Sequence, residues 1–131
     1  MDNERRGGGK QGFRDLIVWQ RAMTLVTEVY KETSHWPREE QFGLTAQVRR
    51  AAVSVPSNIA EGHGRFGARE FLHHASIAFG SLCEVETQLL IAERLSYSDR
   101  VTIETLMEQV TEVRRLLHGL LRSLRDPARS S

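Results

Sequence analysis

The chain has 131 residues, 40% of them hydrophobic and 27% charged, a length and balance that suit one domain built around one core. The single cysteine, Cys83, excludes an internal disulfide framework, and no N-terminal run joins a basic start to an apolar stretch, so we expect a reducing, cytoplasmic setting. No apolar run approaches the roughly 20 residues that a membrane span requires, so we expect no membrane partner.

The net charge of +1 does not by itself indicate a nucleic-acid partner. Sixteen of the 18 basic residues are arginine. The planar guanidinium group suits phosphate and carboxylate recognition, although a GC-rich genome produces the same bias without any function. The arginine content alone therefore does not identify a ligand.

Residues 1–12 are rich in glycine and include Arg5, Arg6 and Lys10, a composition typical of a disordered basic tail. Residues 126–131, which read DPARSS, are expected to fray. Between the two tails we expect a single helical domain over residues 13–125, because apolar residues recur there at helical spacing and nowhere alternate at period 2 for long. The four predicted helices cover residues 15–34, 41–61, 68–95 and 99–125.

Each predicted helix carries one apolar stripe. The stripe of the first helix comprises Leu16, Trp19, Met23, Val26 and Tyr30. The third and fourth helices carry longer stripes of nearly coiled-coil regularity, from Phe71 to Ala92 and from Ile103 to Leu124. Because short connections make neighbouring helices antiparallel, the stripes predict an all-α fold, an antiparallel up-down-up-down four-helix bundle with the long hairpin as its spine.

The third helix carries more apolar residues than one seam needs. The surplus positions are Leu72, Phe79, Cys83 and Leu90. They predict either a subunit interface or a wider core, and the sequence leaves both open.

The stretch GHGRFG at residues 62–67 has the glycine spacing of a dinucleotide-binding loop. Such a loop lies between a strand and a helix, whereas this one follows a predicted helix in a chain without a parallel sheet. We therefore interpret it as a joint between two helices, with Gly62 as a left-handed residue past the helix end and Gly67 at the start of the next helix. Pro56 should kink or bow the second helix, because it removes a backbone donor and crowds the preceding turn.

A polar stripe follows the second helix on the side away from its apolar stripe. Its members are Gln47, Arg50, Ser54, Asn58 and Glu61. The spacing is typical of a solvated face, which is the usual explanation, and an ordered polar contact with another subunit or with a ligand is the alternative.

The segment LTAQVRRAAVSVPSNIAEGHGR, preceded by FRDLIVWQRAM and HWPREEQFGL and followed by EFLHHASIAFGSLCEVETQL, resembles a small bacterial four-helix-bundle family. That family includes the proteins encoded by intervening sequences of large-subunit ribosomal RNA, and the accessory proteins of diversity-generating retroelements are similar to it. The resemblance covers roughly residues 13–120. It implies a bundle that assembles into a ring, typically a homopentamer with a central pore, and for the retroelement proteins it implies binding of RNA and a reverse transcriptase through basic surfaces.

Antiparallel connectivity should collect the charges at two ends of the bundle. One end would gather Arg129, the basic residues of the N-terminal tail and the five predicted nucleic-acid-binding residues, which are Arg14, Arg65, Arg69, Arg122 and Arg125. The other end would gather acidic residues, among them Glu32, Glu39, Glu40, Glu93 and Asp99. In a ring the basic ends would face one way and attract polyanions, although acids early and arginines late in the fourth helix also suit the helix dipole.

The sequence offers little support for catalysis or metal binding. Glu70 and His73 supply one Glu-x-x-His motif, where a di-iron bundle needs two, so we expect no metal and no cofactor. Cys83 lies within a predicted helix with nothing to activate it, and we expect it to be a small apolar filler. Trp36 is the one aromatic residue expected near the surface, and stacking platforms for single strands normally use several.

The leading hypothesis is a non-enzymatic, ring-forming scaffold that binds RNA or DNA through its basic end. One alternative is a protein–protein interaction module without nucleic-acid binding. Another is a site for a small anion where Arg65 and Arg69 meet the start of the third helix. The biological process, the identity of the partners and the ring size do not follow from the sequence.

Overall fold

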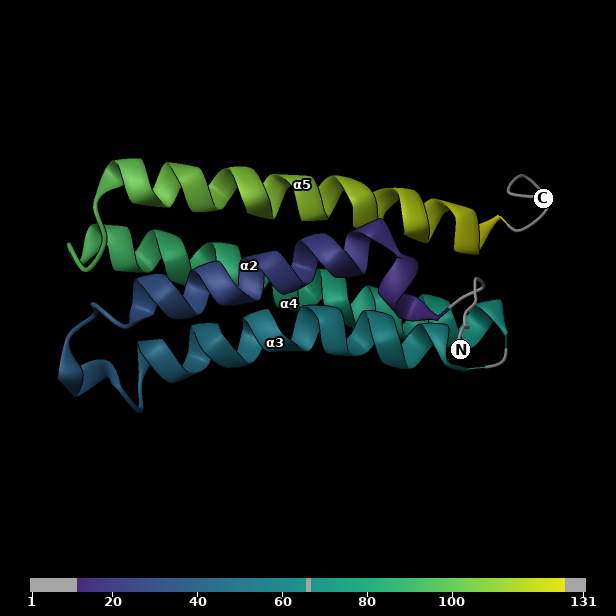
Figure 1. The fold of residues 1–131 in the computed structure, drawn as a ribbon, viewed down its shortest axis with the longest axis horizontal. Helices are drawn as coiled ribbons and strands as arrows, with labels where there is room; N and C mark the ends of the chain where they lie inside the picture. The colour runs from purple at the N-terminus through teal and green to yellow at the C-terminus, as the bar shows by residue number, and fades with distance from the viewer. Residues whose placement is uncertain (1–11, 66, 127–131) are drawn as a thin grey trace, which may run out of the picture.

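The computed structural model describes residues 12–65 and 67–126, and it is an all-α bundle of four long helices with no strand among those residues (Figure 1). A 3-10 turn, η1 (Phe13–Asp15), precedes the first long helix, and a second, η2 (Arg38–Glu40), lies in the loop that follows it. The long helices are α2 (Ile17–Thr33), α3 (Leu44–His63), α4 (Ala68–Arg94) and α5 (Arg100–Arg125). The predicted tail at residues 1–12 lies outside the described part except for Gly12, and the tail at residues 126–131 except for Asp126.

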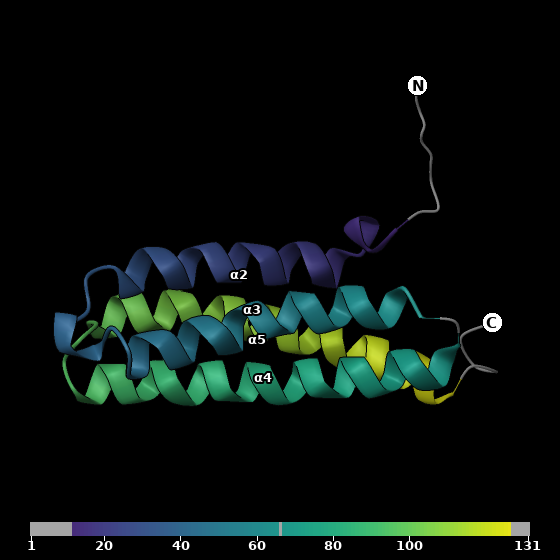
Figure 2. The ribbon, with the colours of Figure 1, turned by 90° about the horizontal axis from the view of Figure 1, so that it is seen from below.

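Each helix packs against the next along the chain, and α5 packs against α2 to complete the bundle (Figures 1 and 2). The start of α2, the end of α3, the start of α4 and the end of α5 lie together at one end. The predicted antiparallel up-down-up-down bundle is therefore confirmed.

The long seams of α4 and α5 form the core as predicted. Ala78, Leu82, Val85 and Leu89 on α4 are fully buried, and so are Val110, Val113 and Leu117 on α5. Near the end of α5 the buried residue is Leu121, while Leu120 and Leu124 are only partly buried. Phe71 is also only partly buried, so the seam loosens where α4 begins and α5 ends.

The predicted stripe of the first helix was wrong by about one residue position. The buried residues of α2 are Val18, Ala22, Leu25, Val29 and Thr33. Met23 is 40% exposed and Tyr30 is 42% exposed, because they lie on the flank toward the outer side of α3. Trp36 corrects a second prediction, since it is buried at 6% exposure and not a surface residue.

Small residues let α3 and α4 approach closely. A Cβ added at Gly62 would lie 2.7 Å from the Cβ of His74 and 2.9 Å from Cδ1 of Phe71. The predicted left-handed role of Gly62 is wrong, because α3 continues to His63 and is followed by Gly64 in a right-handed conformation. Gly67, with φ of +124°, is the residue before α4, as predicted.

Pro56 lies inside α3, which continues for seven more residues beyond it to His63. The ring is buried among apolar neighbours, as are Val55 and Ile59. Burial of this face stabilises the helix and offsets the backbone hydrogen bond that proline cannot donate.

Side-chain hydrogen bonds tie the two loops together at the acidic end. Trp36 Nε1 donates to Ser98 Oγ at 2.7 Å, and Ser98 Oγ donates to Glu32 Oε2 at 2.6 Å. The Tyr97 hydroxyl donates to Glu40 Oε2 at 2.7 Å, while Glu40 Oε1 accepts the Leu44 N–H at 2.9 Å. Glu40 thus caps α3 and holds the α4–α5 loop against it. The sequence predicted only that Glu40 is one of the acidic residues at this end.

Replacement of Gly62 with alanine should destabilise the bundle. The added methyl group would force α3 and α4 apart, at a cost of about 1–3 kcal/mol that exceeds the gain in helix propensity. Gly119→Ala is the matched control, since a Cβ there meets only Arg122 Nη2 at 4.0 Å and should stabilise by about 0.5–1 kcal/mol. Urea unfolding measures both, and equal stability of the two variants would contradict the close approach.

Stability should fall in acid partly through Glu40. The Leu44 N–H, followed by the Tyr97 hydroxyl, holds the pKa of Glu40 below its ordinary value of 4.5. A lowered folded pKa means that the stabilisation is present above about pH 4.5 and is lost as pH falls through the folded value. Glu40→Gln should therefore reduce the loss of stability in acid, measured as urea midpoints between about pH 3 and pH 7.

Glu39→Gln is the control for that series, because Glu39 is an exposed neighbour with no hydrogen bond recorded within the described residues. It should keep the pH dependence of the native chain. If Glu40→Gln kept it too, Glu40 would not be one of the carboxylates whose protonation drives acid unfolding.

Candidate nucleic-acid interface

The five predicted arginines lie at one end of the bundle and are all exposed. Arg14 comes from η1, Arg65 follows α3 and Arg69 lies in the first turn of α4. Arg122 and Arg125 lie in the last turn of α5. The ends of these elements lie together, so three segments distant in sequence, around Arg14, the α3–α4 connection and the end of α5, contribute to one basic end (Figures 1 and 2).

Arg65 differs from the other four because it has a carboxylate partner. Its Nη2 donates to Glu61 Oε2 at 2.8 Å, and this bond, followed by the charge of His74, holds the pKa of Glu61 below its ordinary value of 4.5. Within the described residues no ion pair is recorded for Arg14, Arg69, Arg122 or Arg125. Four guanidinium groups therefore remain available at this end.

The helix dipole accounts for some of these arginines and not for others. Arg122 and Arg125 lie at a helix C-terminus, where the dipole favours positive charge. Arg69 lies in the first turn of α4, where the dipole disfavours it. Complementing a helix dipole cannot be the reason for a cation at Arg69.

The predicted polar stripe does not simply face solvent. Gln47, Arg50 and Glu61 are exposed, but Ser54 and Asn58 bond across the seam to α4. Ser54 Oγ lies 2.8 Å from Ser81 Oγ, and Asn58 Nδ2 donates to Ser54 Oγ at 3.0 Å. Ser54 and Asn58 are thus ordered by contacts within the chain, and a contact of this stripe with another subunit or a ligand stays a prediction.

His74 continues this chain of hydrogen bonds toward the basic end. Its Nδ1 lies 3.1 Å from the side-chain amide of Asn58. The amide nitrogen of Asn58 donates to Ser54, so the atom that faces His74 is the amide oxygen, which can only accept a hydrogen bond. His74 Nδ1 therefore carries a hydrogen, and Nε2 faces Glu61 Oε2 at 3.8 Å. Sequence reasoning missed His74, although its spacing of seven from Ser81 was a visible signal.

A groove of about 540 Å³ lies between α2 and α3, near the acidic end, and we name it the α2–α3 groove. Its lining comprises Tyr30, Gln41, Phe42, Thr45, Ala46, Arg49, Arg50 and Val53. The Arg49 guanidinium lies 4.4 Å from the centre of the Tyr30 ring, and its Nε donates to Thr33 Oγ1 at 2.8 Å. Phe42 is 88% exposed, so among the residues that the structure describes the exposed aromatic side chains are Tyr30 and Phe42 and not Trp36.

The predicted interface residues have different surroundings. Phe79 packs against the core and lies edge-on to His118, with ring centres 4.9 Å apart. Leu72 is partly buried, whereas Leu90 and Cys83 are exposed, so Cys83 is not the buried filler that we expected. A subunit interface at these four residues stays a prediction.

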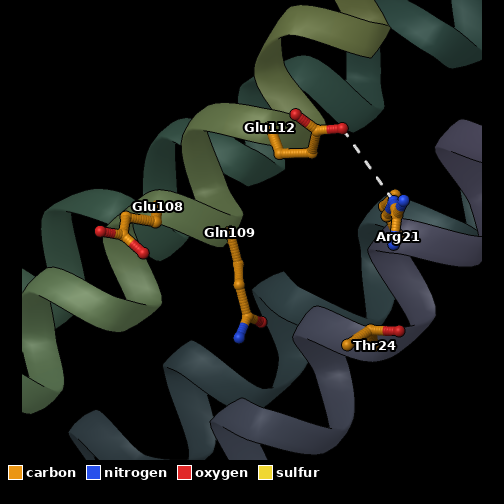
Figure 3. A pocket seen from close by; sticks show the side chains of 5 residues that line it. All are labelled: Arg21, Thr24, Glu108, Gln109 and Glu112. Carbon is orange, nitrogen blue, oxygen red and sulfur yellow. Dashed lines mark ion pairs between the residues drawn. The ribbon is translucent and has the colours of Figure 1, made fainter.

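A cleft of about 370 Å³ between α2 and α5 is a polar site that the sequence did not reveal (Figure 3). Glu108 and Glu112 line it from α5, and Arg21 approaches Glu112 with Nε and Oε2 4.0 Å apart. Gln109 extends into the space between the helices, and its buried Oε1 has no hydrogen-bond partner among the described residues. The cleft therefore offers acceptors with one cation at its edge.

The part of the chain that the structure describes has no cluster of metal ligands and has one helix of membrane-spanning length. No group of three or more His, Cys, Asp or Glu side chains lies close enough there to hold a metal ion. One helix, α4, is long and apolar enough in composition to cross a membrane. Of its most apolar stretch of 18 residues, 33% is buried inside the bundle. Core helices of bundles pass the same test, so this is weak support for a membrane span.

Comparison with known proteins gives one family and one fold. The family described as 23S rRNA-intervening sequence protein matches residues 14–119. A crystal structure of a protein of unknown function from the S23 ribosomal protein family of Bacteroides thetaiotaomicron is similar, with TM-score 0.72 and 22% identity, over 80% of this chain and 98% of that one. This second likeness shows the fold alone. No curated protein matches the chain.

Proposed function

We infer the function from one premise, that the chain belongs to the 23S rRNA-intervening sequence protein family. We propose a non-enzymatic, oligomeric helical-bundle scaffold, active in the cytoplasm, that binds nucleic acid through its basic end. RNA is the first ligand to test, since a polyphosphate chain can contact several arginines at once.

Arg69 is the observation that carries this proposal. It is exposed, it lies where the α4 dipole disfavours a cation, and no carboxylate partner is recorded for it within residues 12–65 and 67–126. A bound polyanion would offset the unfavourable interaction between the Arg69 guanidinium and the α4 dipole, and it would supply the partner that Arg69 lacks among the described residues. Arg122 and Arg125 extend the same surface with two further unpaired guanidinium groups.

The use of polar groups supports a scaffold over an enzyme. Ser54, Asn58 and His74 bond to one another along a helix seam, and their partners hold α3 against α4. Glu32, Glu40 and Asp99 close loops or cap helices at the other end. These groups already have structural roles, so we propose no catalytic residues.

Two alternatives keep specific support. Exposed apolar side chains, among them Phe42, Ile77 and Leu95, favour an interaction module for another protein. The small-anion site is less favoured, because Arg65 is paired with Glu61 and leaves Arg69 as the remaining cation of that proposed pair. Self-assembly, as a pentamer by resemblance to the family, belongs to the scaffold proposal.

The triple variant Arg69→Ala, Arg122→Ala and Arg125→Ala should weaken binding of single-stranded RNA. Each phosphate contact with a single strand contributes about 0.7 to the magnitude of the slope of log K against log salt concentration. Loss of three contacts should therefore reduce the magnitude of that slope by about 2. Fluorescence anisotropy with a labelled RNA over a salt series measures both quantities. A single-stranded DNA of the same sequence tests whether the 2′-hydroxyl matters.

The matched control is Arg38→Ala, Arg94→Ala and Arg100→Ala, which removes the same charge from exposed residues at the opposite end. It should retain the affinity and the salt slope of the native chain. Equal losses in the two triple variants would show that net charge and not the basic end governs binding. No RNA binding by the native chain at low salt would defeat the proposal.

A further inference from the structure

Two surfaces of the bundle that carry exposed apolar side chains have no covering from residues 12–65 and 67–126. One is the α2–α3 groove, and the other is a line on the outer side of α4 formed by Ile77, Gly80, Glu84 and Ile91, which we name the α4 ridge. We propose that the α2–α3 groove of one copy receives the α4 ridge of a second copy, with Arg50 facing Glu84. This inference rests on the proposed self-assembly and specifies the surfaces that carry it.

The groove has the composition of a protein-binding site. Phe42 and Val53 are 88% and 39% exposed, and a tyrosine and two arginines complete the residue types enriched where proteins meet. Its lining includes two cations and no carboxylate among the described residues. Arg49 is held by Thr33 and Tyr30, so Arg50 is the cation free to meet an anion.

The ridge has the complementary composition. Ile77, Glu84 and Ile91 are seven residues apart and therefore share one face of α4. Both isoleucines are 41% exposed, and a Cβ at Gly80 would meet nothing within 4 Å. The ridge is thus a flat apolar strip with one carboxylate at its centre.

The groove and the ridge match in height along the bundle axis. Ser54 lies beside Ser81, and α3 and α4 run in opposite directions. Arg50 is four residues before Ser54 and Glu84 three after Ser81, so at about 1.5 Å per residue they lie at nearly one level. Ile91 is ten residues after Ser81, and Leu44 is ten residues before Ser54, so these two residues also lie at one height along the bundle axis. Leu44 lies between Phe42 and Ala46 of the groove.

This coincidence of level matters because cyclic symmetry turns copies about an axis without shifting them along it. Two side-by-side copies would place the carboxylate opposite the cation and Ile91 opposite the aromatic end of the groove. The two surfaces are different patches of one chain, so their contact is heterologous and can close a ring.

Other occupants suit these surfaces less well. A nucleic acid in the groove would lie near the acidic end of the bundle, whose carboxylates, such as Glu39, disfavour a polyanion. A lipid surface against the ridge would have to take in the Glu84 carboxylate without a partner. A second copy satisfies both the apolar area and the charge.

Charge reversal tests the pairing. Arg50→Glu and Glu84→Arg should each weaken self-association about tenfold or more, because each places like charges together. The double variant should associate like the native chain. An equal mixture of the two single variants should also restore contacts between unlike copies, which a contact within one chain could not produce. In a ring of five at least one contact must still join two like copies, so the expected recovery of association in the mixture is partial. Light scattering over a concentration series gives the molar mass, starting from 14.9 kDa for one copy.

Arg115→Glu is the control, because it reverses a charge on α5, the helix that contributes to neither surface, and it should leave association unchanged. An oligomeric native chain whose association is insensitive to both single variants would overturn the proposed surfaces and leave the scaffold intact. Rescue in the double variant without rescue in the mixture would place the pair within one chain and overturn the inference. A native chain that stays monomeric and sediments with phosphatidylcholine vesicles would assign the ridge to lipid, with the same consequence. RNA binding by the basic end is measured separately, so its failure is distinguishable from these results.

Discussion

The close approach of α3 and α4 is the constraint on which the rest of the bundle depends. Gly62 leaves no room for a side chain beside His74, and the serine pair Ser54–Ser81 lets the two backbones come together in the middle of the seam. A slide of one turn would break the hydrogen bonds of Ser54 and Asn58 and bring another residue to the Gly62 position. The seam therefore selects one register, through sterics and polar pairing together.

This register sets the height of every feature on the outside. It brings the end of α3 level with the start of α4 (Figure 2), so Arg65, just after α3, and Arg69, in the first turn of α4, both belong to the basic end. It also brings the loops at the other end close enough for Tyr97 to reach Glu40 and for Trp36 to reach Ser98. The level of Arg50 with Glu84 follows from the same seam.

The two ends of the bundle use their charges differently. At the acidic end Glu32, Glu40 and Asp99 accept hydrogen bonds that close loops or cap helices. At the basic end Arg65 alone among the five arginines has a partner within the described residues. Acidic side chains thus serve the fold, while Arg69 has neither a carboxylate partner among the described residues nor a favourable helix dipole, and this asymmetry is the reason to look for a polyanion at the basic end.

The sequence by itself determined the four helices, their antiparallel order and the end at which the arginines gather. Those features follow from apolar spacing and loop length, which are local properties of the chain. It did not determine which flank of α2 is buried, because Val18 and Trp19 are about 100° apart and only contact with the neighbouring helices selects between them. The roles of Gly62, Ser54 and His74 were decided by tertiary structure for the same reason, since a close approach or a hydrogen bond between two helices exists only once both are in place.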